Sequence, residues 1–327
     1  MRTTKNNLIM SIGLLLFGGT EFCYAHAQLY RAESYHFGTQ FERKKLLTVA
    51  TMGSYGSTNS GKNGDGNTTN ILNIYGVHKM HQVGKNVVHG TGVSQANIDL
   101  MNTLWGVIPT DNDYGQLEFS GSFYYTGGEA TLTYNPTDEF FIGATFPFYQ
   151  IQTKNPTYID KTPADAKNAT WLAFLANFDT ILTQEGLDRT ASTQSGAGDI
   201  TLFAGWTNNL DDVDGLDFID TTVTAGLLLG NADAKDEGKI FAFAPGYDKH
   251  KGIFISLDFA LGLHEYASFG FHLKELFLLK RTKTLRMQSA AGQNGFIKLG
   301  LGNAEIDRGR IFEVGGFFKL EYSLAAM

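Results

Sequence analysis

The stretch Gly252–Lys274, GIFISLDFALGLHEYASFGFHLK, decides the fold class of this chain. It consists of two alternating arms that are joined by a short turn. Apolar residues at odd positions, such as Leu257 and Phe271, alternate with small or polar residues at even positions, such as Asp258 and His272. Because successive side chains of a strand point to opposite faces, each arm has one apolar face and one polar face. Such a hairpin belongs either to a soluble sandwich or to a membrane barrel, whose apolar face meets lipid.

The same alternation recurs along most of the chain. We expect strands over residues 45–56, 68–75, 117–125, 129–134, 140–148, 200–207, 221–229, 253–261, 269–273 and 312–324. With missed strands allowed for, the count is about ten to about fourteen. The apolar faces of the well-defined arms carry no charge until Glu275, where we expect a β-bulge. Pro147 lies inside a predicted strand, which indicates a rim or bulge position.

The lengths of the connections favour the barrel over the sandwich. Short links at 135–138, 208–217 and 263–267 fall at one end of the predicted sheet. Long links follow Gly56, Gln152, Gly230 and Lys280 at the other end, and we expect the link after Gly230 to be a charged loop. Short periplasmic turns and long outer loops are the habit of outer-membrane barrels. The segment 76–114, with a short predicted helix near 94–104, breaks this rule because it is long and falls at the short-turn end.

One helix is predicted inside the long loop 152–198. Thr162 suits the N-cap, Pro163 suits the first helical position, and Gly186 suits the C-terminal stop. Apolar residues recur between them at helical spacing, namely Trp171, Phe174, Leu175, Phe178, Ile181 and Leu182. This stripe indicates either packing onto the loop and the barrel rim or a lid, and we favour packing.

The N-terminus predicts export. Arg2 and Lys5 precede an apolar core, and Ala25-His26-Ala27 fits a cleavage site, so we assign residues 1–27 to a signal peptide. The mature barrel domain then spans 28–327 without a thiol, because Cys23 is the single cysteine. No later apolar run has the length of a transmembrane helix. The chain ends Ser-Leu-Ala-Ala-Met without a terminal aromatic residue, which indicates a truncated sequence or an atypical last strand.

Motifs of catalysis and metal binding are missing from the sequence. There is no G-x-S-x-G, H-E-x-x-H or P-loop pattern, and we predict neither an enzyme nor a cofactor. His78, His81 and His89 have spacings that suit no zinc site and are interpreted as solvated loop residues. Asp211–Gly215 is interpreted as an acidic turn. The net charge of −7 and the lack of a basic stripe exclude a nucleic-acid partner.

The polar face of the central hairpin provides the candidate binding residues. If the turn is centred on Glu265, Asp258 lies opposite His272 and diagonal to Lys274, and a shift of one residue exchanges the two. A carboxylate inside a narrow barrel is costly unless it is paired, so we expect Asp258 to bind one of these cations. The pair either fills the barrel structurally or, with Asp220 on the neighbouring strand, forms a charged constriction for a solute.

A basic cluster follows the hairpin at the predicted outer end. Lys280, Arg281, Lys283 and Arg286 either bind the phosphates of lipopolysaccharide or form a solvated charge run. Both interpretations stay open on the sequence alone.

The segment Gly196–Leu202, GAGDITL, carries a family resemblance. It resembles the G-x-G-D-hydrophobic strand opening of outer-membrane proteins of the phenol-degradation (MetA pathway) type. These proteins are grouped with FadL-like transporters of long-chain fatty acids and aromatic hydrocarbons. The resemblance implies an outer-membrane transporter. FadL-like transporters have an N-terminal hatch domain, and residues 28–43 are shorter than a full one.

The sequence therefore predicts an all-β protein, an antiparallel transmembrane barrel in the outer membrane of a Gram-negative-type bacterium, with one helix in a long loop. Its expected function is a channel or transporter for small solutes, hydrophobic ones included. Its expected partners are membrane lipids, lipopolysaccharide and the solute. The alternatives are a structural or adhesive barrel that does not conduct and, third, an enzyme with a lumenal site.

Overall fold

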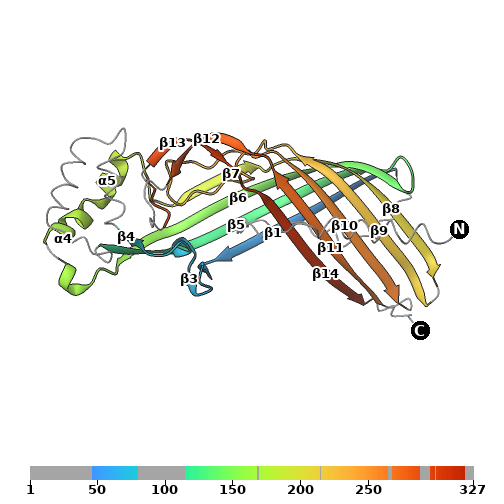
Figure 1. Cartoon of the computed structure of the whole chain (residues 1–327), viewed down its shortest axis with the longest axis horizontal. Coiled ribbons are helices and arrows are strands. Elements are labelled where there is room, and N and C mark those ends of the chain that lie inside the picture. The colour runs from blue at the N-terminus through green and yellow to red at the C-terminus, as the bar shows by residue number, and fades with distance from the viewer. Residues whose placement is uncertain are drawn as a thin grey trace.

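The computed structural model describes residues 46–79, 115–167, 169–213, 215–263, 267–287, 295–298 and 300–320. The predicted signal peptide with Cys23, the segment 28–43, the helix near 94–104, His81, His89 and Glu265 lie outside these residues. The described part is mostly antiparallel β-structure and forms one large curled sheet (Figure 1). The all-β prediction is therefore confirmed at the level of a curled, barrel-like antiparallel sheet.

The main sheet has ten strands, eight of which form its continuous path. In spatial order the path is β1 (Leu47–Thr58), β5 (Gln116–Tyr134), β6 (Phe140–Asp160), β8 (Thr201–Val213), β9 (Leu216–Leu228), β10 (Gly252–Leu263), β11 (Ala267–Leu278) and β14 (Arg310–Leu320). The short strands β4 (His78–Lys79) and β7 (Ser192–Ala197) pair with β5 and β6. Among the described residues, β1 pairs only with β5 and β14 only with β11, so these two are the edges.

Short and long links segregate to opposite ends of the sheet, as predicted. The predicted strand over 68–75 is wrong, because only β3 (Thr68–Asn70) is extended, and it pairs with β2 (Ser60–Lys62) outside the main sheet. β1 therefore pairs directly with β5, and the link 59–115 joins the other long links at one end. The predicted turn 208–217 is also too long, because β8 continues to Val213 and β9 begins at Leu216.

The outward face of the sheet is apolar along registered rows. One row joins side chains of seven neighbouring strands, namely Val49, Leu132, Ala144, Leu202, Leu227, Ile253 and Phe277. Five of these seven side chains are exposed, and Ile253, for example, retains 50% of its accessible surface, whereas Ala144 and Phe277 are half-buried. The predicted bulge at Glu275 is wrong, because β11 pairs without a register shift on both sides. Glu275 instead remains on the outward face and binds Arg310 of β14 at 3.5 Å.

The strands β5 and β6 extend beyond the rest of the sheet and exchange their apolar face on the way. Leu132 and Tyr134 of β5 point outward, whereas Phe123 and Tyr125, at positions of the opposite parity, are buried. The sequence predicted two strands with a break at Gly127–Gly128, but β5 runs through both glycines. A Cβ at Gly127 would lie 2.6 Å from the ring of Tyr149 on β6, which explains the glycine.

Pro147 occupies the position on β6 where the neighbouring strand changes. Residues 140–145 of β6 pair with β8, and residues 148–153 pair with β7. The carbonyl of Pro147 accepts a 2.8 Å hydrogen bond from Gly198 between these two ladders. Proline has no N–H to donate, so it fits where a ladder is interrupted. The predicted rim or bulge at Pro147 is therefore wrong, because β6 pairs with β5 through this residue without a register shift, and the proline lies at a gap between two ladders instead.

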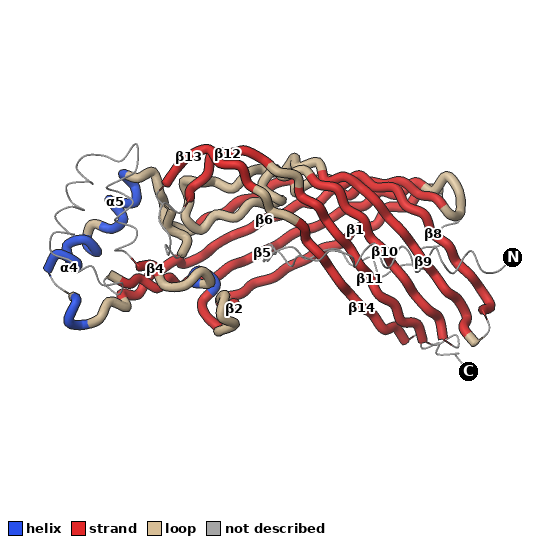
Figure 2. Tube along the Cα trace, in the orientation of Figure 1, coloured by secondary structure: helices blue, strands red, loops and turns tan. Residues whose placement is uncertain are grey.

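The extension of β5 and β6 carries a separate apolar core, which we call the head (Figure 2). The head comprises residues 116–125 of β5, residues 149–160 of β6, two helices and the strap 295–298. Its helices are α4 (Ala169–Ala176) and α5 (Phe178–Gln184), preceded by the 3₁₀ turn η2 (Ala164–Ala166). A second 3₁₀ turn, η1 (Ile71–Asn73), packs its buried Ile71 and Leu72 into the same core.

The predicted single helix is therefore two helices, which are separated at Asn177. The apolar stripe is packed rather than free, because Trp171 and Phe178 are 3% and 1% exposed. Gly186 ends α5 as predicted, with φ of +67° and bonds from Gly186 N to Thr183 O and from Leu187 N to Leu182 O. Thr162 is not an N-cap. Its hydroxyl accepts a hydrogen bond from the Gln116 backbone N–H instead.

The last long link contains a hairpin, β12 (Arg281–Met287) and β13 (Gly300–Ile306). It lies over the end of the curled sheet from which the long links emerge (Figure 1). The sequence predicts a long loop here, because the residues of β12 and β13 show no regular alternation of apolar and polar side chains.

Candidate functional site

The predicted pair Asp258–His272 is present on the concave face of the sheet. The two residues are direct partners in the β10–β11 register, as a turn centred on Glu265 requires. Nδ1 of His272 donates a hydrogen bond to Oδ1 of Asp258 at 2.7 Å. About a fifth of each side chain remains exposed, 20% for His272 and 23% for Asp258. The predicted contact is confirmed, and its role in solute binding stays a prediction.

Asp220 and Lys274 flank this pair in the adjacent rows. Asp220 of β9 is 2% exposed and accepts a 3.4 Å hydrogen bond from the Thr207 hydroxyl. Lys274 is the register partner of Glu313 on β14, and its Nζ lies 5.4 Å from the centre of the Phe254 ring. The four predicted residues thus occupy three consecutive rows of one face. That arrangement can order charged or polar groups of a solute along the sheet.

Above these rows, a loop enters the space enclosed by the sheet. The link 230–251 was predicted to be a charged loop, but its residues 240–250, which we call the inner loop, are almost entirely buried. Phe241 is 0% exposed and belongs to the apolar core of the head. Tyr247 is 3% exposed and packs in a second cluster with side chains of β9, β10 and β11, which are Leu228, Phe254, Leu276 and Leu278. The prediction was wrong because an irregular buried segment has no periodicity.

Asp199 fixes the inner loop to the start of β8. Its carboxylate, 2% exposed, accepts hydrogen bonds from the backbone N–H groups of Ala232 (2.9 Å) and Tyr247. A Cβ at Gly246 would collide with this carboxylate, and one at Gly198 would lie 2.6 Å from the Tyr149 ring. The G-x-G-D segment therefore has a structural explanation in this chain. Its second glycine, Gly198, permits close approach, and its aspartate holds a distant loop.

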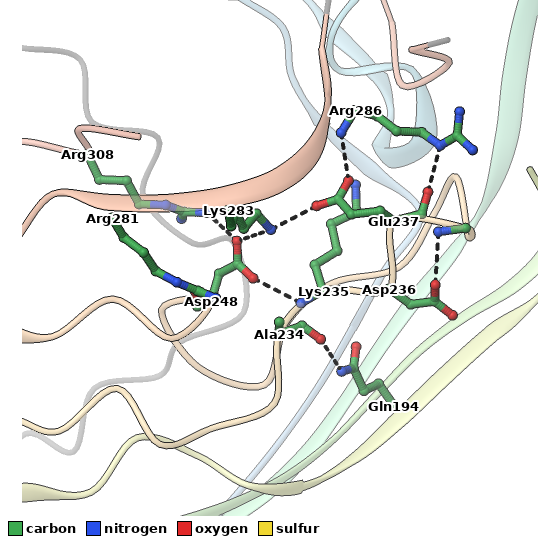
Figure 3. Close-up of polar contacts among 11 residues, drawn as sticks. Gln194, Ala234, Lys235, Asp236, Glu237, Asp248, Arg281, Lys283, Arg286 and Arg308 are labelled. Atoms are coloured by element: carbon green, nitrogen blue, oxygen red, sulfur yellow. Dashed lines mark hydrogen bonds and ion pairs between the residues drawn. The ribbon is translucent and has the colours of Figure 1, made fainter. Parts of the chain in front are cut away.

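Asp248 holds the other end of the inner loop (Figure 3). Its carboxylate is 4% exposed and accepts from Lys283 Nζ at 2.5 Å and from the Lys235 backbone N–H at 3.0 Å. Arg308 lies 3.7 Å from it, and Arg281 donates to the Asp248 backbone carbonyl. Asp248 and Lys249 both have positive φ, 56° and 62°, which marks a sharp and strained turn. Nothing in the local sequence indicated this role for Asp248.

The predicted basic cluster is therefore largely internal. Lys283 is 9% exposed and also binds Glu237 at 2.8 Å. Arg286 donates to the backbone carbonyls of Glu237, Glu185 and Gly186. Lys280 binds Glu305 at 3.1 Å on the surface. The interpretation as a solvated charge run is wrong for Lys283, because a side chain that takes part in two ion pairs is buried.

Two buried histidines lie outside the concave rows. His78 was interpreted as a solvated residue, but it is 0% exposed and packs edge-on against Phe119. Its Nε2 accepts from the backbone N–H of Phe296 at 3.1 Å, and burial lowers its pKa to about 3. His250 is 0% exposed, and its Nδ1 donates to the Leu279 carbonyl. Burial lowers the pKa of His250 as well. Both imidazoles are neutral at pH 7 and act as packing elements.

Within the residues that the structure describes, no group of three or more His, Cys, Asp or Glu side chains is arranged to hold a metal ion. None of the helices in these residues combines the length and the apolar character that a membrane crossing requires. Compared with protein families, curated proteins and solved structures, the chain matches none of them. The geometry of the site is thus the main guide to function.

Proposed function

We propose that the chain is an outer-membrane β-barrel that acts as a channel or transporter for small solutes, hydrophobic ones included. The observation that carries this proposal is that the sheet exposes its apolar face and has charged residues on the concave face, the reverse of the pattern in a soluble protein. Exposed apolar side chains form continuous outward rows, whereas Asp220, Asp258, His272 and Lys274 occupy the concave face. A lipid-facing surface and a polar lumen require this distribution. The FadL-like resemblance of residues 196–202 agrees with the proposal.

Strand lengths support a membrane-spanning sheet. The strands β8, β9, β10, β11 and β14 contain 13, 13, 12, 12 and 11 residues. A tilted strand needs about 9–11 residues to cross the hydrocarbon core. We call the outward faces of these five strands, of β1, and of residues 126–134 of β5 and 140–148 of β6 the apolar belt.

The register of the sheet supports closure into a barrel. The edge strands β1 and β14 run antiparallel, because the path contains an even number of antiparallel strands. The row that starts at Val49 near the beginning of β1 reaches Arg310 at the beginning of β14. Closing the sheet would place Arg310 beside Ser57 or Asn59, a stagger of about eight or ten residues, which suits an eight-stranded barrel.

Disulfide pairing tests this closure, since the only native cysteine lies in the predicted signal peptide. The smaller stagger predicts a bond between Ala50→Cys and Phe317→Cys, and the larger one a bond between Met52→Cys and Phe317→Cys. Formation of one bond by the monomer in membranes, seen as a mobility shift that reductant reverses, supports closure. Neither bond forming, or bonds only between two copies, contradicts it.

Conductance and fractionation test the function itself. Purified protein is expected to produce discrete conductance steps in planar bilayers and to require detergent for extraction from outer membranes. Its electrophoretic mobility should change on heating. Recovery in the soluble periplasmic fraction without detergent would exclude the proposed location. A membrane-inserted protein that never conducts would favour the alternative of a structural or adhesive barrel.

That alternative has one specific observation in its favour, the buried inner loop. A loop that fills the enclosed space can block passage or can move aside. Asp199→Cys with Gly246→Cys would join this loop to the start of β8, because a Cβ at Gly246 meets the Asp199 carboxylate. A channel gated by the loop conducts when this bond is reduced and is silent when it is oxidised. A filled barrel is silent in both states.

A matched pair controls for the cross-link itself. Thr131→Cys and Thr145→Cys lie opposite each other on β5 and β6, with hydroxyls 3.0 Å apart, and do not touch the inner loop. Oxidation of this pair should leave conductance unchanged. Equal loss of conductance in both pairs would mean that oxidation damages the barrel generally.

A further inference from the structure

The charged side chains around Asp248 and Glu237 include more cations than carboxylates. Four cations contact Asp248 or Glu237, either at the carboxylate or at the backbone, namely Arg281, Lys283, Arg286 and Arg308. Figure 3 shows that Lys235, which precedes the inner loop in the same link, extends into this group. The nearby carboxylate of Asp236 is directed to the Gly238 backbone N–H at 2.9 Å. This excess of positive charge contrasts with the acidic chain as a whole, whose net charge is −7.

Lys235 and Lys298 stand out within this group, because neither ammonium forms an ion pair in the part of the chain that the structure describes. Both side chains are half-buried. Burial lowers the pKa of Lys235, and Lys298 and Lys283 lower it further, while Glu237 and Asp248 act in the opposite direction. Cations that are close together and removed from water are unfavourable unless an anion offsets their charge.

Packing of the strap 295–298 brings Lys298 to this position. Phe296 contacts Phe241 and Phe243 of the inner loop, with ring centres 5.6 and 6.4 Å apart. The neighbouring Ile297 is 0% exposed and belongs to the head core. Lys298 is thus held beside the inner loop, and the backbone of Lys235 is tied to the same loop by its hydrogen bond to the Asp248 carboxylate, although the two lysines are far apart in sequence. The backbones of both lysines are held by these contacts, so their positions are set by the fold and not by two flexible segments.

We propose that Lys235 and Lys298, with Lys283 between the two carboxylates, form an anion-binding site at the entrance to the concave face. Its ligand class is a small solute that bears a carboxylate or phosphate group, which ammonium groups bind through charge-assisted hydrogen bonds. The site rests on the proposed function for its role in transport, because it names the class of solute that enters. Below it lie the apolar cluster around Tyr247 and then the row of Lys274.

Binding of inorganic phosphate to detergent-purified full-length protein tests the site without any transport. Isothermal titration at constant ionic strength should show saturable binding by the native chain. The double substitution Lys235→Gln and Lys298→Gln should weaken that binding at least tenfold. Phosphate should raise the Tm of the native chain and leave the Tm of the variant unchanged. Equal affinity in the two proteins would overturn the proposal.

The double substitution Lys62→Gln and Lys154→Gln is the matched control. Both lysines are exposed, Lys62 on β2 and Lys154 on β6 over the Tyr124 ring, and together their substitution removes the same two charges. This control should leave phosphate affinity unchanged. A loss equal to that of the double variant would assign the effect to net charge and would also overturn the site. A double variant with a lowered Tm in the absence of phosphate would assign the lysines a structural role, which contradicts the proposal.

Planar bilayers separate failure of the site from failure of the proposed function. In a KCl gradient the native channel should favour chloride. The double variant should shift the zero-current potential towards the equilibrium potential of potassium. Phosphate affinity that is lost in the variant, together with no conductance by either protein, would support the site and contradict the channel. Conductance with unchanged selectivity and no phosphate binding would support the channel and overturn the site. Binding of phosphate only when added lipid is present would indicate a lipid headgroup instead of a solute and would overturn this version.

Discussion

On β5, Leu132 and Tyr134 are 41% and 42% exposed, whereas Phe123 and Tyr125, earlier on the same strand, are 4% and 5% exposed. The first pair belongs to the apolar belt and the second to the head. The same exchange occurs on β6, where Phe148 is 58% exposed and Ile151 is 2% exposed. One continuous strand therefore passes through two environments. Its apolar residues occupy even positions in the belt and odd positions in the head. The level of that change marks where we expect lipid to give way to water.

The largest expected effect lies in the head. Phe119 is 0% exposed and has aromatic contacts with Tyr158 and Phe241. Phe119→Ala should lower the free energy of unfolding by about 3–5 kcal/mol, because a buried cavity remains. Equilibrium unfolding in detergent measures this loss. Phe318→Ala, at a site that is 66% exposed in the belt, is the control and should have little effect. Similar losses in both variants would contradict the distinction between head and belt.

The next effect tests whether the belt meets lipid. Leu257→Arg places a charge on the outward face of β10 and should cost about 2–4 kcal/mol in bilayer refolding if the site is near the midplane. Leu172→Arg on α4, at a site that is 55% exposed in the head, should have almost no effect. A cost near zero for Leu257→Arg would mean that this face is wet.

Acid should destabilise the head through His78. Its pKa is about 3 in the folded chain and near 6.5 when unfolded, so the unfolded chain binds the extra proton between these values. Stability contributed by neutral His78 is therefore present above pH 6.5 and falls by about 1.4 kcal/mol per pH unit below it. Denaturant unfolding at pH 7 and pH 5 should show a loss of about 2 kcal/mol that His78→Asn removes. An identical pH dependence in the variant would contradict this assignment.

The smallest effect concerns the concave face of the belt. Asp258→Asn keeps an acceptor for His272 but removes the charge, so the expected loss of stability is about 1 kcal/mol. If the residue also forms a constriction, ion selectivity in planar bilayers should change with it. Asp65→Asn, in the exposed turn after β2, removes the same charge far from this face and serves as control. Lowered stability with unchanged selectivity would leave only the structural role.

The sequence predicted the belt well and the head poorly, for a physical reason. Strands such as β10 and β11 alternate over their whole length, and the register that pairs Asp258 with His272 follows from a short turn. The head depends on contacts between distant segments, such as His78 with Phe296, which no local pattern encodes. The polar residues of β6 after Gln150 likewise resemble a loop, although they pair with β5 as far as Asp160.

The candidate site divides in the same way. Asp258, His272, Lys274 and Asp220 could be predicted, because alternation assigns each of them to one face. Asp248 and Asp199 could not be predicted as anchors of the inner loop, since their partners lie in loops without periodicity. The lysine pair at the entrance was hidden for the same reason.

The continuity of β5 and β6 through belt and head restricts how these strands can vary in length. Adding one residue to β5 at Gly127 would keep the pairing of Leu132 with the belt but turn Phe123 and Phe119 away from their core. Adding two residues would restore the parity, and a bulge would absorb a single one. The register shift already present between Ser120 and Ser122 is such a site. Insertions and deletions between belt and head should therefore be tolerated in even numbers, or singly where a bulge compensates, whereas the links 135–139 and 214–215 are free of this constraint.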